Sequence, residues 1–339
     1  INMKITIRDV AEKSGVSVGT VSRVFNGYTD VSEATKKHVM QVATKLGYTP
    51  NIAARTLSSK RTKTIALIIN EINISLGLTF PLEVMSGVIK YTDDTDYEFV
   101  FYSMNLKKQK QKTLKQFCNE HNITGGIIQG LKLSDPYYRE LQTTDIPCVI
   151  IDMKINNPKV GTISIDNETA SKQVAETLIQ YGHKDILFIS GKRDVGVSIE
   201  REAGFRQGLE ENNIAINESL IQYANFNEKI AYLLTKDALA EYNFTAIYAI
   251  SDLMALGVLN ALKEMDIKVP DEMSVFGFDD IVLSQYVQPA LATVKQDMEI
   301  MGFSAAELLA SILDGETSGD IKRYISHELK LRESLRERK

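Results

Sequence analysis

Residues 6–27 read TIRDVAEKSGVSVGTVSRVFNG, and this stretch decides the fold of the first part of the chain. Thr6 followed three residues later by Asp9 is a helix-capping pattern. Gly15 ends this first helix, and Ser17 caps a second one. Two short helices joined by a tight turn are typical of a helix-turn-helix, in which the second helix enters the major groove of DNA.

A third helix and a linker complete the first sixty residues. Ser32 caps the third helix and Gly47 ends it. Asn51 to Ser58 predict a further short helix, and Ser59 to Lys63 form a polar, basic linker. We therefore predict a helix-turn-helix domain over residues 1–49, then a hinge helix and linker over 50–63.

The charge of the chain is divided unevenly. Residues 1–63 carry eleven Lys and Arg but four Asp and Glu, which gives this segment +7, whereas the whole chain is −5 and the remainder is −12. A basic head on an acidic body indicates that only the head meets a polyanion.

The second helix supplies the candidates for reading bases. Arg23 can donate two parallel hydrogen bonds to a guanine, while Val18 and Gly19 offer no polar side chain, so part of the selectivity would come from apolar contacts and groove shape. Short polar residues near the helix ends suit phosphate oxygens, which set register without reading sequence. These residues are Ser17, Thr20, Ser22, Asn26 and Ser32.

From Thr64 onward, short apolar runs alternate with amphipathic stretches of 10–17 residues. This pattern predicts an α/β fold with parallel sheets covered by helices on both faces, and about ten strands suit two doubly wound subdomains. We predict one effector-binding domain over 64–339. Its N-subdomain would span about 64–163 plus 294–323, and its C-subdomain about 164–293 plus 324–339.

The head resembles that of the lactose/galactose repressor (LacI/GalR) family in Thr6–Ala11, Gly15–Ser17, Thr20–Val24 and Asn26-Gly27. Tyr48-x-Pro50-Asn51 and Ala53-Ala54-Arg55-x-Leu57 resemble the family's hinge. The resemblance implies a homodimer on palindromic operator DNA, with Leu57 as an apolar wedge in the minor groove. The DNA-binding residues predicted from motifs and resemblance together are Thr6, Ser17, Val18, Gly19, Thr20, Ser22, Arg23, Asn26, Ser32, Asn51, Ala54 and Leu57.

The rest of the chain resembles the family's effector domain, which is of periplasmic-binding-protein type, in motifs that include Ile163–Asn167 and Gly277–Asp280. Arg201 stands early in a helix and Asp279 just past an apolar strand, so the pair offers a fork donor and an acceptor for the hydroxyls of a sugar. The resemblance places both at the family's effector positions, and it adds a set of lining residues: Gln129, Asp152, Ser251 and Gln296. The chain has no Trp, and Phe226 is the candidate platform for a sugar ring.

Several classes of function are not supported by the sequence. No apolar run reaches the length of about 18 residues that a membrane helix needs. Cys118 and Cys148 are too few for a disulfide scaffold, and the four scattered histidines predict no metal site. We find no catalytic constellation and no cofactor motif, so we expect a cytoplasmic protein that is not an enzyme.

The interpretation is thus a carbohydrate-responsive repressor, whose effector would be a small sugar or sugar phosphate. One alternative is a global carbon regulator with a phosphorylated carrier protein as corepressor. In such relatives the carrier docks where this chain has Ile281 to Pro289, a stretch without arginine. A solute-binding protein without DNA function is an alternative of another class, and the basic head argues against it.

Overall fold

The computed structural model describes residues 5–25, 28, 30–48, 63–71, 80–317 and 321–338. The chain forms two compact units, a head up to Lys63 and a sensor unit from Thr64. We describe each unit by itself.

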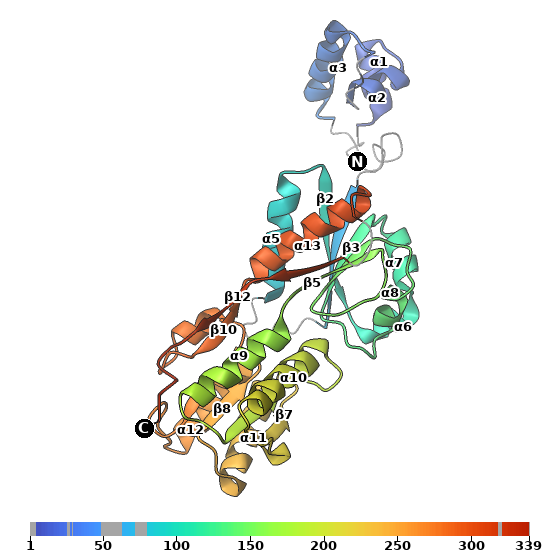
Figure 1. Ribbon diagram of the computed structural model, residues 1–339. Coiled ribbons are helices and arrows are strands. Elements are labelled where there is room, and N and C mark those ends of the chain that lie inside the picture. The colour runs from blue at the N-terminus through green and yellow to red at the C-terminus, as the bar shows by residue number, and fades with distance from the viewer. Residues whose placement is uncertain are drawn as a thin grey trace. The chain divides into compact units, whose positions relative to one another are not determined.

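The head is a bundle of three helices, α1 (Ile7–Ser14), α2 (Val18–Phe25) and α3 (Glu33–Leu46) (Figure 1). Its small core consists of aliphatic side chains from all three helices, namely Val10, Ala11, Val21, Val24, Val39 and Ala43. Gly15 and Gly47 follow α1 and α3 with φ of 69° and 66°, a left-handed conformation that glycine adopts without strain. The three helices and their caps are those predicted from the sequence.

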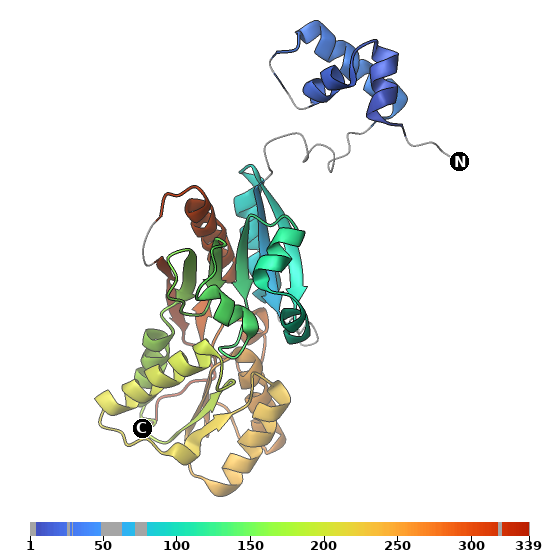
Figure 2. The same cartoon turned by 90° about the vertical axis from the view of Figure 1, so that its right-hand side faces the viewer.

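The sensor unit contains two lobes, each built on its own sheet (Figures 1 and 2). The N-terminal lobe has a six-stranded sheet in the order β11-β5-β4-β3-β1-β2. Its strands are β1 (Lys63–Asn70), β2 (Tyr97–Met104), β3 (Gly125–Gln129), β4 (Cys148–Ile151), β5 (Val160–Ile165) and β11 (Lys322–Ile325). Its helices are α5 (Phe80–Asp93), α6 (Leu106–Gln111), α7 (Leu114–Glu120), α8 (Pro136–Leu141) and α13 (Met298–Leu313).

The C-terminal lobe has a four-stranded parallel sheet in the order β7-β6-β8-β9. Its strands are β6 (Ile186–Ser190), β7 (Ile221–Tyr223), β8 (Ala246–Ala249) and β9 (Ser274–Phe276). Its helices are α9 (Asn167–Gln180), α10 (Gly196–Glu211), α11 (Glu228–Glu241) and α12 (Asp252–Glu264), with the short helices η2 (Glu218–Leu220) and η3 (Val282–Gln285). Helix α9 packs on α10 and α11 packs on α12, and the sheet lies between the two pairs (Figure 2).

Alternating side chains of the strands form two cores in the N-terminal lobe. Ile65, Leu67 and Ile127 face α5 and α13, whereas Ile68 and Ile128 face the side of α7 and α8. Strand residues alternate between the two faces of a sheet, so a strand buried on both faces needs an unbroken apolar run. The fold class predicted from these runs, with parallel sheets covered on both faces, is confirmed.

The structure corrects the prediction in two places. Lys107–His121, one of the amphipathic stretches from which single helices were predicted, forms two helices. The chain leaves the first helix at Lys112, and Thr113 caps α7 by accepting from the Gln116 N–H. A further pair, β10 (Thr293–Gln296) and β12 (His327–Lys330), is antiparallel, although only parallel pairing was expected.

Three chain segments connect the lobes. The first runs from β5 into α9, the second from β9 through β10 to α13, and the third from β11 into β12. After β12 the chain returns to the C-terminal lobe, where Ser334 Oγ donates to the Val275 carbonyl and the Arg336 N–H donates to Ser274 Oγ. No helix of the described residues has the length and apolar character required to span a membrane.

Candidate functional site

Except for Arg201, which lies on α10, the predicted effector residues lie at or just beyond the ends of strands of the two lobes. Gln129 is the last residue of β3 and Gln296 the last of β10, while Asp152 directly follows β4. Asp279 lies three residues beyond β9. Ligands of open α/β sheets bind beyond the carboxyl ends of the strands, so these positions are suited to a ligand site.

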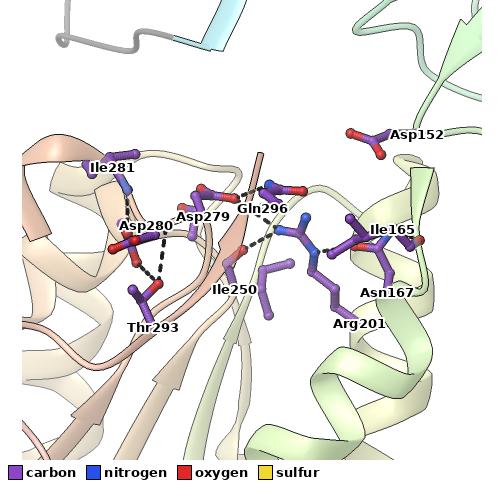
Figure 3. A network of polar contacts seen from close by, with 12 residues as sticks. Asp152, Ile165, Asn167, Arg201, Ile250, Asp279, Asp280, Ile281, Thr293 and Gln296 are labelled. Atoms are coloured by element: carbon purple, nitrogen blue, oxygen red, sulfur yellow. Dashed lines mark hydrogen bonds and ion pairs between the residues drawn. The ribbon is translucent and has the colours of Figure 1, made fainter. Parts of the chain in front are cut away.

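Arg201, on α10, is the centre of the polar network in Figure 3, and its side chain is only 4% exposed. Its Nε donates to Asn167 Oδ1 at 2.8 Å, and its Nη1 donates to the carbonyl oxygen of Ile250 at 2.7 Å. The guanidinium lies 3.6 Å from the centre of the Phe278 ring. These contacts fix the plane of the guanidinium, which is the condition for directional binding of a ligand.

Asp279 is the acid that faces this cation. Its Oδ1 lies 3.6 Å from Arg201 Nη1 and accepts from Gln296 Nε2 at 2.7 Å. Burial raises the pKa of Asp279 to about 7, although Arg201 and Gln296 favour the charged form. A neighbouring carboxyl, Asp252, also lies buried, and burial together with the charge of Asp279 raises its pKa well above the usual value.

Asp152 belongs to the N-terminal lobe and lies opposite the Arg201 network in Figure 3. Its backbone has φ of 62°, in the left-handed region. Its Oδ1 accepts from Ser164 Oγ at 2.8 Å. Burial raises the pKa of this carboxyl and Arg201 lowers it, so the structure places the two groups within electrostatic reach of each other.

The other predicted lining residues differ in what they can offer. Ser251 caps α12 by accepting from the Met254 N–H at 3.3 Å, so its hydroxyl already has a structural role. In contrast, Oε1 of Gln129 and Oε1 of Gln296 are buried and have no partner within the described part of the chain. A buried acceptor without a partner costs about 1–3 kcal/mol, which a bound donor would recover.

Two serines share with these glutamines a buried oxygen without a partner among the described residues, and neither was predicted from the sequence. Ser190 ends β6 and Ser198 lies in the first turn of α10, and both hydroxyls are buried without a partner among the described residues. Ser190 could have been found from its place, because it is the last residue of the apolar run Ile186–Ser190. Ser198 has no such signal.

The ring of Phe226 lies against the backbone of Gly191 and beside the Ser198 hydroxyl, since a Cβ added to Gly191 would meet both. Phe226 adopts φ of 56° and is half-buried. The structure therefore places it beyond β7 and next to the loop that follows β6.

The two lobes contact each other beside the site. The Leu133 N–H donates to the Asp194 carbonyl oxygen at 3.0 Å, and Ser134 Oγ donates to Asp194 Oδ2 at 3.0 Å. Lys154 Nζ lies 2.9 Å from Glu200 Oε1. These contacts depend on the relative placement of the lobes, so a rotation of one lobe would change them.

In the head, the polar residues predicted to contact DNA are arranged around the helix starts. Thr6 Oγ1 donates to Asp9 Oδ2 at 2.7 Å, Ser17 Oγ accepts from the Thr20 N–H at 3.0 Å, and Ser32 Oγ accepts from the Thr35 N–H at 3.2 Å. The hydroxyls of Ser17 and Ser32 therefore cap helices, whereas at the start of α1 the Asp9 carboxylate accepts from both the N–H and the hydroxyl of Thr6. Gly19 and Ser22 lie on α2, and the predicted Asn26, Asn51, Ala54 and Leu57 lie outside the described residues.

Arg23 is exposed at the end of α2, where its Nη1 lies 2.9 Å from Asp30 Oδ2. Val18, at the start of the same helix, is 43% exposed. An exposed ion pair contributes only about 0–1 kcal/mol, so Arg23 can leave Asp30 for another partner at small cost.

Comparison with known proteins gives a matching family model for each of the two units. Residues 6–51 match the family model for bacterial regulatory proteins of the lacI family, and residues 175–335 match that for a periplasmic binding protein-like domain. The chain is 31% identical over 333 residues to the HTH-type transcriptional regulator CelR of Thermobifida fusca (97% of this chain, 98% of the relative). It is 30% identical over 341 residues to catabolite control protein A of Priestia megaterium (98% and 100%).

Two solved structures illustrate the likeness. The lac repressor dimer bound to operator and the anti-inducer ONPF has a TM-score of 0.86 with 26% identity, covering 98% of this chain and 100% of the other. A CelR–cellobiose complex has a TM-score of 0.75 with 29% identity, covering 97% and 99%. A helix-turn-helix head joined to a binding-protein-like unit defines a ligand-responsive DNA-binding regulator. The chain belongs to the LacI family, and the predictions of family and of a DNA-binding transcriptional regulator are confirmed.

Proposed function

We propose that this regulator is a dimeric repressor controlled by an unphosphorylated sugar that binds between the two lobes. The observation that carries the proposal is the placement of Arg201, Asp279 and Gln296 opposite Asp152. A guanidinium and carboxylates in fixed positions can donate to and accept from vicinal hydroxyls, and Gln129 adds an unpartnered acceptor. Cellobiose in the CelR complex supports a sugar as the class of ligand.

The charges of the site favour a neutral ligand over a sugar phosphate. Arg201 is the one cation in the network, and Asp152 and Asp279 together offset it. A phosphate group would bring about −1.5 to −2 charges into this buried region, where unpaired charge is strongly disfavoured. Hydroxyl groups bring none, and they can donate to the carboxylates.

The mechanism we infer is a shift of population between two arrangements of the lobes. One arrangement holds both heads of a dimer at the spacing of two operator half-sites, and the ligand changes that arrangement only through its different affinity for the two states. Contacts across the lobes, such as Ser134 to Asp194, differ between such states. Because operator DNA is the partner, we place the protein in the cytoplasm.

A carrier-protein corepressor is the second candidate within this class. In η3 and just after it, Val282, Leu283 and Tyr286 are exposed, and residues 281–289 include no arginine or lysine to receive a phosphate group. Arg332 contacts Ser284 of η3, but it is paired with Asp280. An exposed apolar segment of this kind suits a second copy of the chain better.

We also infer no catalytic role, because Asp279 and Asp280 have separate partners, Gln296 and Arg332.

The test is a titration of operator binding with glucose, cellobiose, galactose and glucose 6-phosphate. We expect one unphosphorylated sugar to change operator affinity and glucose 6-phosphate to be at least about tenfold weaker than glucose or without effect. Asp279→Ala should bind operator as the unmodified protein does and lose the response. A response to the phosphate alone would refute the neutral-ligand assignment, and an unchanged response of Asp279→Ala would refute the site.

A further inference from the structure

Asn167 occupies the point at which the chain first passes from one lobe to the other. It is the first residue of α9, directly after the segment that leaves β5, and it is 1% exposed. Its side chain is not needed to start the helix, because Asp166 is the cap and accepts from the Thr169 N–H at 3.0 Å. Asn is also a weak helix former, so the local fold gives no reason for an amide here.

The amide of Asn167 instead connects groups from both lobes. Its Oδ1 accepts from Arg201 Nε at 2.8 Å, and its Nδ2 donates to Ser164 Oγ at 3.1 Å. Ser164, on β5, donates in turn to Asp152 Oδ1 at 2.8 Å. One line of hydrogen bonds therefore runs from the Asp152 carboxylate of the N-terminal lobe to the Arg201 guanidinium of the C-terminal lobe.

Only a group that accepts on one side and donates on the other can hold this line together. The Arg201 guanidinium has donors only, and Ser164 has given its single proton to Asp152, so it must receive one from Asn167. A carboxylate in place of the amide could satisfy Arg201 but not Ser164. It would also face Glu200, whose Oε2 lies 3.3 Å from Asn167 Nδ2.

We propose that Asn167 is a positioning residue for the effector: it holds Arg201 and, through Ser164, Asp152 at one fixed separation while the site is assembled from both lobes. The inference rests on the proposed function, since the two groups that it positions are those assigned to the ligand. Asn167 lies on the segment that joins the two lobes. A rotation of the lobes about this segment would therefore break the hydrogen bonds that connect Asp152 to Arg201, unless a bound ligand keeps these two residues together.

The experiment compares Asn167→Ala and Asn167→Asp with a matched control, Asn157→Ala. Asn157 is a partly buried asparagine without contact to the site. Its Nδ2 donates to the carbonyl oxygens of Leu141 and Thr144, and its Oδ1 accepts from the Lys159 N–H. Binding of glucose and cellobiose is measured by calorimetry at pH 8.0 and 5.5. Operator binding and thermal unfolding are recorded for every variant.

We expect Asn167→Ala to weaken sugar binding by about tenfold or more while operator binding persists. At pH 8.0 Asn167→Asp should bind sugar as weakly as Asn167→Ala. At pH 5.5 its sugar affinity should approach that of the unmodified protein, because a protonated carboxyl both accepts and donates as the amide does. The charged groups around it are Arg201 and Glu200 on α10, Asp152 after β4 and Lys154. Asn157→Ala should lower only the unfolding temperature, and a purely structural role of Asn167 would give the same result.

A second readout needs no sugar. In ¹⁵N-labelled protein the Nε–H signal of Arg201, assigned by its loss in Arg201→Lys, should shift in Asn167→Ala and stay in place in Asn157→Ala. An unshifted signal, or sugar affinity in Asn167→Ala equal to that of the unmodified protein, would overturn the proposal. If the unmodified protein binds no sugar, the proposed function fails, and the Arg201 signal still decides whether Asn167 positions the guanidinium.

Discussion

Substituting Asp279 by Asn should remove part of the pH dependence of stability. In the folded protein the pKa of Asp279 is about 7, compared with the ordinary 3.8. The folded state therefore binds this proton more tightly than the unfolded state, so stability falls as the pH rises toward 7 and levels off above it. Between pH 5.5 and 8.5 this single carboxyl lowers the free energy of unfolding by about 2 kcal/mol.

The assay is urea unfolding of both proteins at pH 5.5 and pH 8.5. We expect the unmodified protein to lose about 2 kcal/mol more than Asp279→Asn between these values. The variant also lacks the charge that raises the pKa of Asp252, and this second effect flattens its profile further. Asp145→Asn serves as control, because Lys115 lowers the pKa of this exposed acid and keeps it charged over the whole interval.

The reasoning is refuted if Asp279→Asn and the unmodified protein show the same change between the two pH values. Sugar binding gives an independent check on the same residue. Replacing a charged acceptor by a neutral one of the same shape costs about 1.5–3 kcal/mol, which corresponds to an affinity roughly 10- to 150-fold lower.

Three further predictions concern other parts of the chain. Arg23→Ala should reduce the preference for operator over unrelated DNA in competition gel shifts without changing thermal unfolding, because its ion pair with Asp30 is exposed; a preserved preference would mean that other residues read the bases. Gly191→Ala should weaken sugar binding in calorimetry, because the added Cβ displaces the Phe226 ring and crowds Ser198 Oγ; unchanged affinity would exclude Phe226 as a platform. Neither cysteine should react with Ellman's reagent in the native protein at pH 8, because burial raises the pKa of Cys118 to about 12 and also that of Cys148, whereas two thiols should react in urea.

The sequence predicted the head closely because its signals are local. Ser17, Ser32, Gly15 and Gly47 act within one helical turn, so each cap could be identified from neighbouring residues alone. The buried strands could also be predicted from the sequence, since a parallel strand covered on both faces must be apolar throughout. β11 was not identified because it lies at the edge of its sheet, and its alternation of exposed and half-buried residues gives no apolar run.

The site could be predicted only in part, because its residues are far apart in the chain. Arg201, Asp279 and Asp152 follow from their places near strand ends and from the family resemblance. The hydrogen bonds that orient Arg201 do not follow, since Asn167 and Ile250 are 34 and 49 residues away along the chain. The hydrogen-bond partners of each side chain depend on the packing of α10 against α9, and no local sequence pattern predicts that packing.

The late return of the chain to the N-terminal lobe has a consequence for synthesis. The head has its own core, formed by side chains within the first 48 residues, whereas the six-stranded sheet needs β11, whose last residue is Ile325. At about 5–20 residues per second, a ribosome completes β11 roughly fifteen seconds to a minute after the residues that form the core of the head. A nascent regulator thus has a folded head before it has a sensor, and a product cut short before α13 and β11 would carry that head without the control that a ligand exerts.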